Sequence, residues 1–238
     1  MMRIIFGSFI LTVFVFQSCV FSDWNNGISG DGNVVTETVD VDGFTGVHAS
    51  SGIDVNISQG DFYVEVEADE NLHEVIIVEL DGNMLRIDSE QNIYKAKSKV
   101  VNVILPELTD IKISSAGDIT AMTGFDCQDV DIDISSAGDL DIELDAKDVK
   151  VSISSSGDCD ISGTAVSLDA RLSSAGDLDA AELIADFVDV SVSSAGDASV
   201  YANEEIKMSA SSAGNIYYHG DAEVLKSHTS SAGKIRRK

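Results

Sequence analysis

One five-residue sequence, Ser-Ser-Ala-Gly-Asp, recurs through the second half of the chain and constrains its fold more than any other feature. Four identical copies begin at Ser114, Ser135, Ser173 and Ser193, and three copies with one substitution begin at Ser154, Ser211 and Ser230. The glycines of successive copies are 21, 19, 19, 20, 18 and 19 residues apart. A period this regular indicates a stacked repeat, in which each unit packs against the next.

Each copy follows a run of alternating apolar and polar residues, as in residues 130–134, 149–153, 188–192 and 206–210. Such alternation predicts a strand with one inward face. A second apolar position follows each Gly-Asp and predicts a second short strand; it is held by Ile119, Leu140, Cys159, Leu178 and Ile216. A unit of about 19 residues cannot bury its own apolar stripe, but stacked units can. We therefore predict an all-β fold, a right-handed single-stranded parallel β-helix (β-solenoid) of about 19-residue rungs with an N-terminal β cap.

The repeat itself is expected to form a corner. Continued alternation would place the second serine inward, as at Ser136, Ser174 and Ser194. Glycine is expected there for one of two reasons. Either the corner needs a φ angle that glycine adopts at little cost, or neighbouring rungs come too close for a side chain.

The aspartates of the repeat should stack in one file: Asp118, Asp139, Asp158, Asp177 and Asp197. Like charges about 5 Å apart repel by roughly 1–3 kcal/mol per pair. Water and salt, fanned side chains, backbone N–H groups or bound Ca²⁺ must relieve that repulsion. Oxygen-rich Asp clusters suit Ca²⁺, so these five residues are candidate ligands. Solvated carboxylates are the simpler interpretation, and we predict neither a metal nor a cofactor.

The chain divides into four expected segments. Residues 1–18 read as a signal peptide and 19–35 as a flexible tether, 36–110 as a β-rich capping part, and 111–238 as the repeats. Within the cap, Asp81-Gly82-Asn83 lies between two apolar runs and predicts a hairpin. Residues 69–72 predict one helical turn. A cap is expected because an uncovered end would expose both core and unpaired backbone.

The N-terminus carries an export signal. Arg3 precedes an apolar run from Ile4 to Phe16, which is too short for a membrane span and suits a signal peptide. The run ends in Phe16-Gln17-Ser18-Cys19, which resembles the lipobox of bacterial lipoproteins, and that resemblance implies lipidation of Cys19. We expect an exported protein, lipid-anchored at the outer membrane on its periplasmic or cell-surface side. Plain secretion is the alternative.

The charge of the chain excludes some partners. Acids outnumber bases 41 to 15, which gives a net charge of −26. Nucleic-acid binding depends on Lys and Arg neutralising phosphates, so no nucleic-acid partner is expected. Three cysteines do not make a disulfide framework, and Cys127 and Cys159 occupy different positions within their repeats.

Few residues suggest a catalytic or binding site. Between residues 113 and 206 there are 21 acids and three bases, so a lyase acting on acidic sugars would lack basic residues. Asp pairs for glycoside hydrolysis can be drawn anywhere along the repeats and therefore carry no signal. Tyr217-Tyr218-His219 is the single aromatic cluster of the array and is a candidate sugar-binding platform, or else packs the end rung. The basic tail 234–238 reads as a C-terminal cap that discourages edge-to-edge pairing, or as a docking patch.

Several motifs together resemble the head GIN domain of auto-transporter adhesins, a family of exported bacterial lipoproteins. The resemblance runs from about Thr38 to Gly233 and rests on these stretches and on the repeat: Gly43-Phe44-Thr45-Gly46-Val47, Ser51-Gly52-Ile53-Asp54-Val55, Ala68-Asp69-Glu70-Asn71-Leu72 and Asp81-Gly82-Asn83-Met84-Leu85. It implies a pectate-lyase-like β-helix at the cell envelope, with no catalytic residues to transfer.

We therefore predict a non-catalytic envelope lipoprotein that binds an envelope or extracellular ligand, either a carbohydrate or a protein. The alternatives are a carbohydrate-active β-helix enzyme (polysaccharide lyase or hydrolase) and a structural envelope scaffold.

Overall fold

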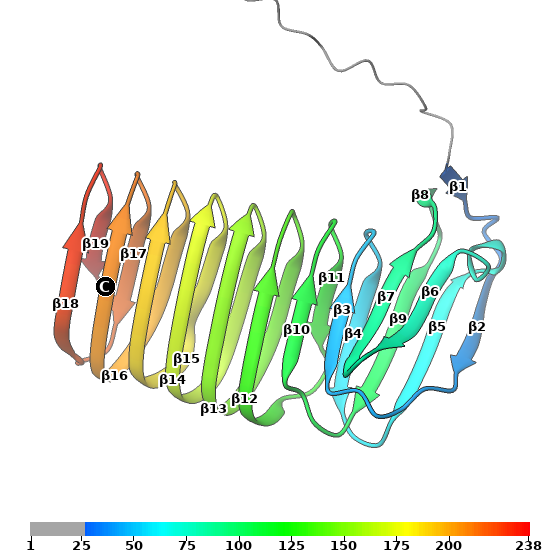
Figure 1. The fold of residues 1–238 in the computed structure, drawn as a ribbon, viewed down its shortest axis with the longest axis horizontal. Helices are drawn as coiled ribbons and strands as arrows, with labels where there is room; N and C mark the ends of the chain where they lie inside the picture. The colour runs from blue at the N-terminus through cyan, green and yellow to red at the C-terminus, as the bar shows by residue number, and fades with distance from the viewer. Residues whose placement is uncertain (1–26) are drawn as a thin grey trace, which may run out of the picture.

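The computed structural model describes residues 27–238, which form a β-solenoid with a cap at one end (Figure 1). Parallel coils stack about 19 residues apart in about seven turns, so the predicted all-β solenoid is confirmed. The signal peptide and Cys19 lie outside the described residues. From residue 27 onward, the chain contains no helix with the length and hydropathy of a membrane span.

The array consists of strands that run from one corner of the repeat to the next. Its strands are β10 (Asp110–Ile113), β11 (Asp118–Ala121), β12 (Phe125–Ile134), β13 (Asp139–Ser155), β14 (Asp158–Ser174), β15 (Asp177–Ser193), β16 (Asp197–Ser211), β17 (Asn215–His219), β18 (Glu223–Thr229) and β19 (Lys234–Arg237). Strands β13 to β16 each cover almost a whole coil, because strand pairing continues through the bend opposite the repeat corner, at the bottom of Figure 1.

Parallel pairing in register stacks like residues on one another. Val149 of β13 lies opposite Val130 of β12 and Leu168 of β14, and all three are buried. Cys159 lies between Leu140 and Leu178 and fills the core position predicted for it. Cys159 and Cys127 are both free, and burial raises the pKa of each thiol. The core is one continuous cluster of mainly aliphatic side chains that runs through the cap and the array.

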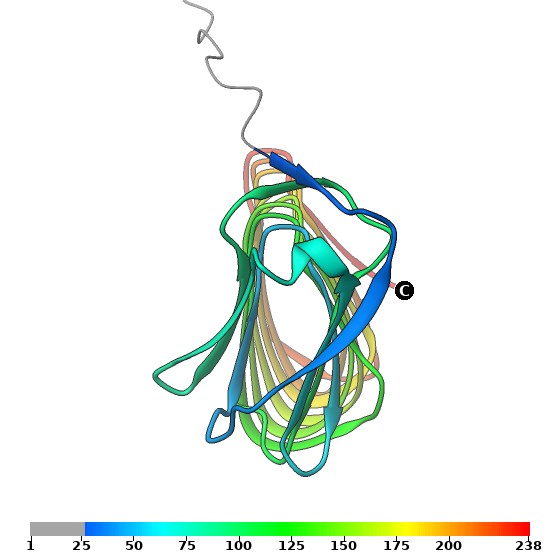
Figure 2. The same cartoon turned by 90° about the vertical axis from the view of Figure 1, so that its right-hand side faces the viewer.

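Each coil presents two outward faces. The front face comprises the outward residues of β3, β10, β18 and the C-terminal halves of β12 to β16, which precede the corners. The back face comprises the outward residues of β4, β11, β17, β19 and the N-terminal halves of β13 to β16, which follow the corners. Viewed along the solenoid, the two walls are long and close together (Figure 2).

At the corners, serine and alanine adopt the left-handed backbone conformation, and glycine does not. The φ angle is 67° at Ser136, 72° at Ser174 and 66° at Ser194, and all three side chains are exposed. The prediction that these serines point inward is therefore wrong. The left-handed turn moves only the second serine out of the alternating pattern: Gly138 and Leu140, which continue the inward series from Ile134, are buried as the alternation predicts.

The corner glycines are required by close approach between coils. A Cβ on Gly138 would lie 2.6 Å from the carbonyl oxygen of Gly117 and would also overlap Ile113. Gly157 has the same relation to Gly138, with 3.0 Å from its Cβ position to the carbonyl oxygen. Of the two reasons predicted for glycine, the close approach of neighbouring rungs is confirmed.

The parallel stack extends into the segment predicted as the cap. Strand β3 (Gly46–Ala49) pairs with β10, and β4 (Asp54–Gln59) pairs with β11 in parallel. The turn between them has φ of 57° at Ser51 and 65° at Gly52, and it places Asp54 opposite Asp118. Residues 46–59 are therefore another coil, which the repeat search misses because the sequence Ser-Ser-Gly-Ile-Asp departs from the pattern.

Antiparallel strands complete the cap. Its further elements are β1 (Gly27–Ser29), β2 (Val34–Val39), β5 (Tyr63–Asp69), η1 (Glu70–Leu72), β6 (Ile76–Asp81), β7 (Met84–Ser89), β8 (Asn92–Lys95) and β9 (Lys99–Leu105). Strands β7 and β9 still pair in parallel with β3 and β4, whereas β2, β5 and β6 pair antiparallel. The hairpin around Gly82 and the helical turn at η1 agree with the predictions from sequence.

Part of the segment predicted as a tether lies in strands. Residues 27–29 form β1, which pairs with β8, and residues 34–35 begin β2, which pairs with β5. Ile28 packs against the core. Asn71 donates a hydrogen bond to the carbonyl oxygen of Ser29 at 2.9 Å. These contacts explain why a polar, glycine-rich sequence is held against the cap here.

Candidate functional site

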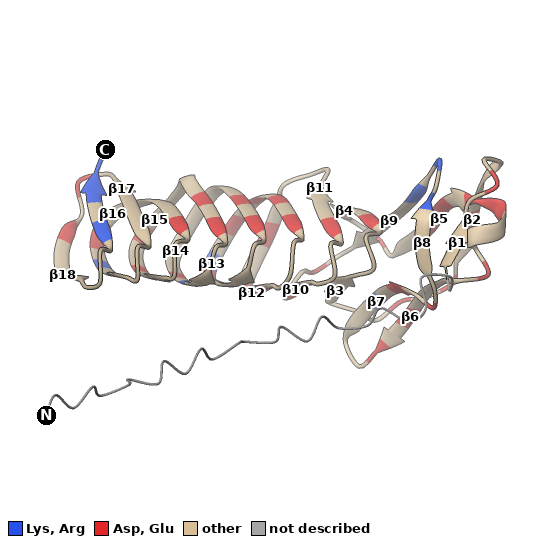
Figure 3. Cartoon of the chain, turned by 90° about the horizontal axis from the view of Figure 1, so that it is seen from above, with Lys and Arg blue, Asp and Glu red and all other residues tan. Residues whose placement is uncertain are grey.

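The predicted aspartate file is present on the back face. Strand register places Asp118, Asp139, Asp158, Asp177 and Asp197 opposite one another on successive coils. Asp54 precedes the file, and Asn215 and Lys234 follow it. The charge along this line therefore changes from acidic to neutral to basic toward the C-terminal end. Figure 3 shows the acidic bands side by side across the coils and the basic strand β19 at one end.

A second file of aspartates runs beside the first. Asp141, Asp160 and Asp179 lie opposite one another on β13, β14 and β15, each two residues after a member of the first file. Because side chains alternate along a strand, both files point outward. We call these six residues the acidic double file: Asp139, Asp141, Asp158, Asp160, Asp177 and Asp179. Sequence analysis missed the second file, although Asp-x-Asp follows three of the glycines.

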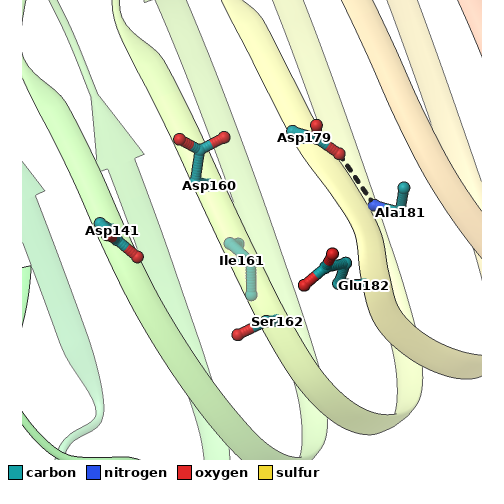
Figure 4. A pocket seen from close by; sticks show the side chains of 7 residues that line it. All are labelled: Asp141, Asp160, Ile161, Ser162, Asp179, Ala181 and Glu182. Atoms are coloured by element: carbon teal, nitrogen blue, oxygen red, sulfur yellow. Dashed lines mark hydrogen bonds between the residues drawn. The ribbon is translucent and has the colours of Figure 1, made fainter.

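A surface depression of about 310 Å³ opens beside Asp160, between Asp141 and Asp179 (Figure 4). A β-bulge shapes its far side: Asp160 pairs with Asp179, but Ser162 pairs with Glu182, so Ala181 has no opposite residue. The backbone N–H of Ala181 donates to Oδ1 of Asp179 at 3.1 Å. The bulge thus brings a fourth carboxylate, that of Glu182, to the depression.

Within the double file, burial and neighbouring carboxylates disfavour the ionised form of the aspartates. Burial raises the pKa of Asp160, and the charges of Asp179 and Asp141 raise it further. The pKa of Asp158 is raised by burial and by Asp139 and Asp177 in the same way. A positively charged group or a hydrogen-bond donor that approaches such a site stabilises its carboxylates.

Backbone and side-chain donors relieve part of the repulsion along the file. The N–H of Asp139 donates to Oδ1 of Asp118 at 3.2 Å, and the N–H of Asp197 donates to Oδ1 of Asp177 at 3.0 Å. The side-chain amide of Asn215 donates to Oδ1 of Asp197 at 2.6 Å. Among residues 27–238, no three acidic, histidine or cysteine side chains are grouped as metal ligands. Solvated carboxylates along the file stay the prediction, with bound Ca²⁺ as the alternative.

The aromatic cluster at 217–219 is divided by its strand. Tyr218 packs against the core, while Tyr217 follows Ser199 on the back face. The Tyr217 ring is covered by the ammonium group of Lys238, which lies 4.3 Å from the ring centroid. The two tyrosines therefore do not form one platform, since alternation along β17 sends them to opposite sides.

The front face differs because it holds bases among its acids. Lys150 lies between Asp131 and Asp169 in the strand register, beside a depression of about 580 Å³. Arg171 forms an ion pair with Asp169 at 2.9 Å. These bases offset part of the acidic charge of the front face, whereas the acidic double file of the back face has only acids opposite one another in the register.

Comparison with known proteins agrees with this architecture. Residues 43–222 match the family described as "putative auto-transporter adhesin, head GIN domain". A putative adhesin from Bacteroides fragilis shares the fold, with a TM-score of 0.83 and 23% identity over 89% of this chain and 100% of the other. A putative lipid binding protein from Parabacteroides distasonis gives a TM-score of 0.72, at 20% identity over 89% and 99% of the two chains. A putative adhesin from Parabacteroides merdae gives 0.68, at 20% identity over 90% and 100%. No curated protein matches the sequence.

Proposed function

The chain belongs to the family of putative auto-transporter adhesins with a head GIN domain, and from this premise we propose that it is a non-catalytic binding module that attaches to an envelope or extracellular ligand through its back face. A family match over residues 43–222 covers most of the cap and most of the array. Several solved neighbours carry adhesin names. Both observations support a binding role.

The cluster of carboxylates around the depression at Asp160 is the observation that carries the choice of face. Four carboxylates line the depression around it, and its closest charged neighbours are acids. Carboxylates accept hydrogen bonds from sugar hydroxyls and attract amines, whereas they repel acidic chains. The ligand class that fits is a neutral or amine-bearing carbohydrate, or a basic segment of a protein.

A binding assay on the full-length chain tests the choice of face. We would first screen neutral, amine-bearing and acidic glycans and basic proteins for binding. We would then measure a back-face double variant, Asp160→Asn combined with Asp179→Asn. Its control is a front-face double variant, Asp133→Asn combined with Asp189→Asn. The back-face pair should lose at least about tenfold in affinity, equivalent to about 1.4 kcal/mol. Equal affinities for the two pairs would remove the back face as the site.

The same screen distinguishes a binding module from a carbohydrate-active enzyme. Carboxylates with raised pKa values could serve as general acids. Release of products from a polysaccharide, abolished by Asp160→Asn, would replace the binding module with a carbohydrate-active enzyme. Binding without turnover supports the module.

The proposed location is the outer membrane, through a lipid on Cys19. The described chain begins at the capped end, and the array extends away from it (Figure 1). Residues 20–26 separate Cys19 from Gly27, so an anchor there would hold the cap near the membrane and direct the array outward. Membrane fractionation of Cys19→Ser checks this: the variant should become soluble, and unchanged fractionation would contradict the anchor.

A further inference from the structure

Strand β6 is an exposed sheet edge in the middle of the chain. Within residues 27–238 its strand register is with β7 alone, from Ile76 opposite Ser89 to Asp81 opposite Met84. The hairpin that these two strands form leaves the body sideways (Figure 2), and the view from above agrees (Figure 3). The second edge of β6 therefore carries backbone N–H and C=O groups that can pair with another strand.

The side chains of this edge are unusually apolar. Register with the buried Leu85 and Ile87 puts Leu80 and Val78 on the inner face of the hairpin, and Leu80 is 46% exposed. Strand β6 contains no lysine or proline, and its pairing has no bulge. Strand β18 has both a register shift and Lys226, which are devices that discourage edge pairing.

We propose that β6 docks against β6 of a second copy of this chain, antiparallel and about a two-fold axis at Val78. The two-residue turn at Gly82 makes the flanking pair, Asp81 and Met84, hydrogen-bonded. Alternation then turns the backbone groups of residues 76, 78 and 80 toward the free edge.

The register on Val78 is self-complementary. It places Ile76 opposite Leu80 of the second copy and Val78 opposite its own equivalent, so the inner face is apolar throughout. On the outer face, Ile77 lies opposite Glu79 of the second copy, and the two Glu79 carboxylates do not face each other. Glu79 is already paired with Arg86 of its own chain at 2.6 Å. A two-fold contact of this kind closes on itself and yields a dimer.

The contact is small, and the copies repel each other. One added strand pair falls well below the roughly 800 Å² per partner of a standard interface. Each copy also carries a net charge of −26. Association is therefore weak in dilute solution, is strengthened by salt that screens the repulsion, and gains where copies share one surface. It does not depend on the proposed ligand.

Sedimentation velocity of full-length Cys19→Ser protein tests the dimer. The dimer fraction should rise with concentration and rise again between about 0.05 and 0.5 M NaCl, where the Debye length falls from over 10 Å to under 5 Å. Val78→Lys should remove the dimer, while Leu225→Lys on β18 should leave it unchanged. A monomer at every concentration and salt, or equal dimerisation of both variants, would overturn the proposal.

Oxidative cross-linking tests the register and stays informative if Val78→Lys misfolds. Val78→Cys should form a disulfide dimer alone, whereas Ile77→Cys should do so only when mixed with Glu79→Cys. Leu225→Cys is the matched exposed control. Cross-linking of Val78→Cys no greater than that of the control would rule out the two-fold contact.

Discussion

The cap and the back face of the array hold their aspartates in opposite ways. In the cap, Asp88 accepts hydrogen bonds from Ser51 at 2.6 Å, from Arg86 at 2.6 Å and from the N–H of Ser89 at 2.8 Å. Burial acts to raise the pKa of Asp88, but these donors together lower it well below its usual range. In the array, Asp158 and Asp160 face other aspartates, and their pKa values are raised.

The contrast shows which interactions the array depends on. Its carboxylates oppose stacking by roughly 1–3 kcal/mol per neighbouring pair. Each fully buried aliphatic side chain contributes about 1.5–3 kcal/mol, and every coil buries several of them. Apolar stacking and fitted corners therefore hold the array together against the charge of its back face, whereas the polar contacts of Asp88 add stability in the cap.

The largest expected effect is at a corner. Gly138→Ala should cost at least about 2–3 kcal/mol in the free energy of unfolding, because the new methyl group meets the backbone of Gly117 and cannot be accommodated. Gly82→Ala in the cap hairpin is the control. Its φ is +66° and no atom lies within 4 Å of its Cβ position, so only the left-handed penalty of about 1–2 kcal/mol applies. Urea unfolding compares them, and equal losses would refute close packing at the corners.

Acid should affect the two regions with opposite sign. The raised pKa values of Asp158 and Asp160 mean that the array gains stability as pH falls from 7 through those values. The lowered pKa of Asp88 means that its contribution to the cap is present above the unfolded value of about 3.9 and is lost below it. Hydrogen exchange should show the array gaining protection as the pH is lowered from 7, and the cap opening first below the unfolded aspartate pKa of about 3.9.

Two variants serve as controls for the pH experiment. Asp88→Asn should cost about 1–3 kcal/mol at pH 7 and flatten the acid loss in the cap. A double variant, Asp158→Asn combined with Asp160→Asn, should reduce the gain in array stability at lower pH. A cap that stays protected at pH 3 while the array opens would contradict the comparison.

Salt should give the smallest effect, and only in the array. Raising NaCl from about 0.02 to 0.5 M should raise the midpoint of array unfolding by a few degrees, since exposed like charges are screened. Adding Ca²⁺ or EDTA at constant ionic strength tests the five candidate ligands Asp118, Asp139, Asp158, Asp177 and Asp197. Solvated carboxylates predict no further shift, and a clear rise with Ca²⁺ would assign an ion to the file.

Repetition made the array predictable. The period indicates the stacking, the alternation indicates the inward residues, and both place Asp118 to Asp197 in one file, as the strand register confirms. The prediction that Ser136 and its equivalents point inward is wrong, because it extends the alternation of the strand through the corner. A left-handed serine leaves no mark in composition, and nothing in the pattern separates it from an extended one.

Regions without repetition were less predictable. The parallel coil at residues 46–59 is hidden by its variant corner, and β1 depends on contacts with residues far along the chain. The depression at Asp160 depends on a bulge at Ala181 within β15. The repeat pattern does not show that Glu182 joins Asp141, Asp160 and Asp179, because the extra residue of the bulge shifts the register there.

The buried corner glycines make the array behave like a ruler. Since no side chain fits between one corner and the next, the step from coil to coil is fixed at the strand spacing of about 4.8 Å. Loss or duplication of one whole unit, such as residues 139–157, would move everything beyond it by one step and leave every remaining corner intact. The length of the array can therefore change in discrete steps, by the number of repeat units, while the chemistry of each face is preserved.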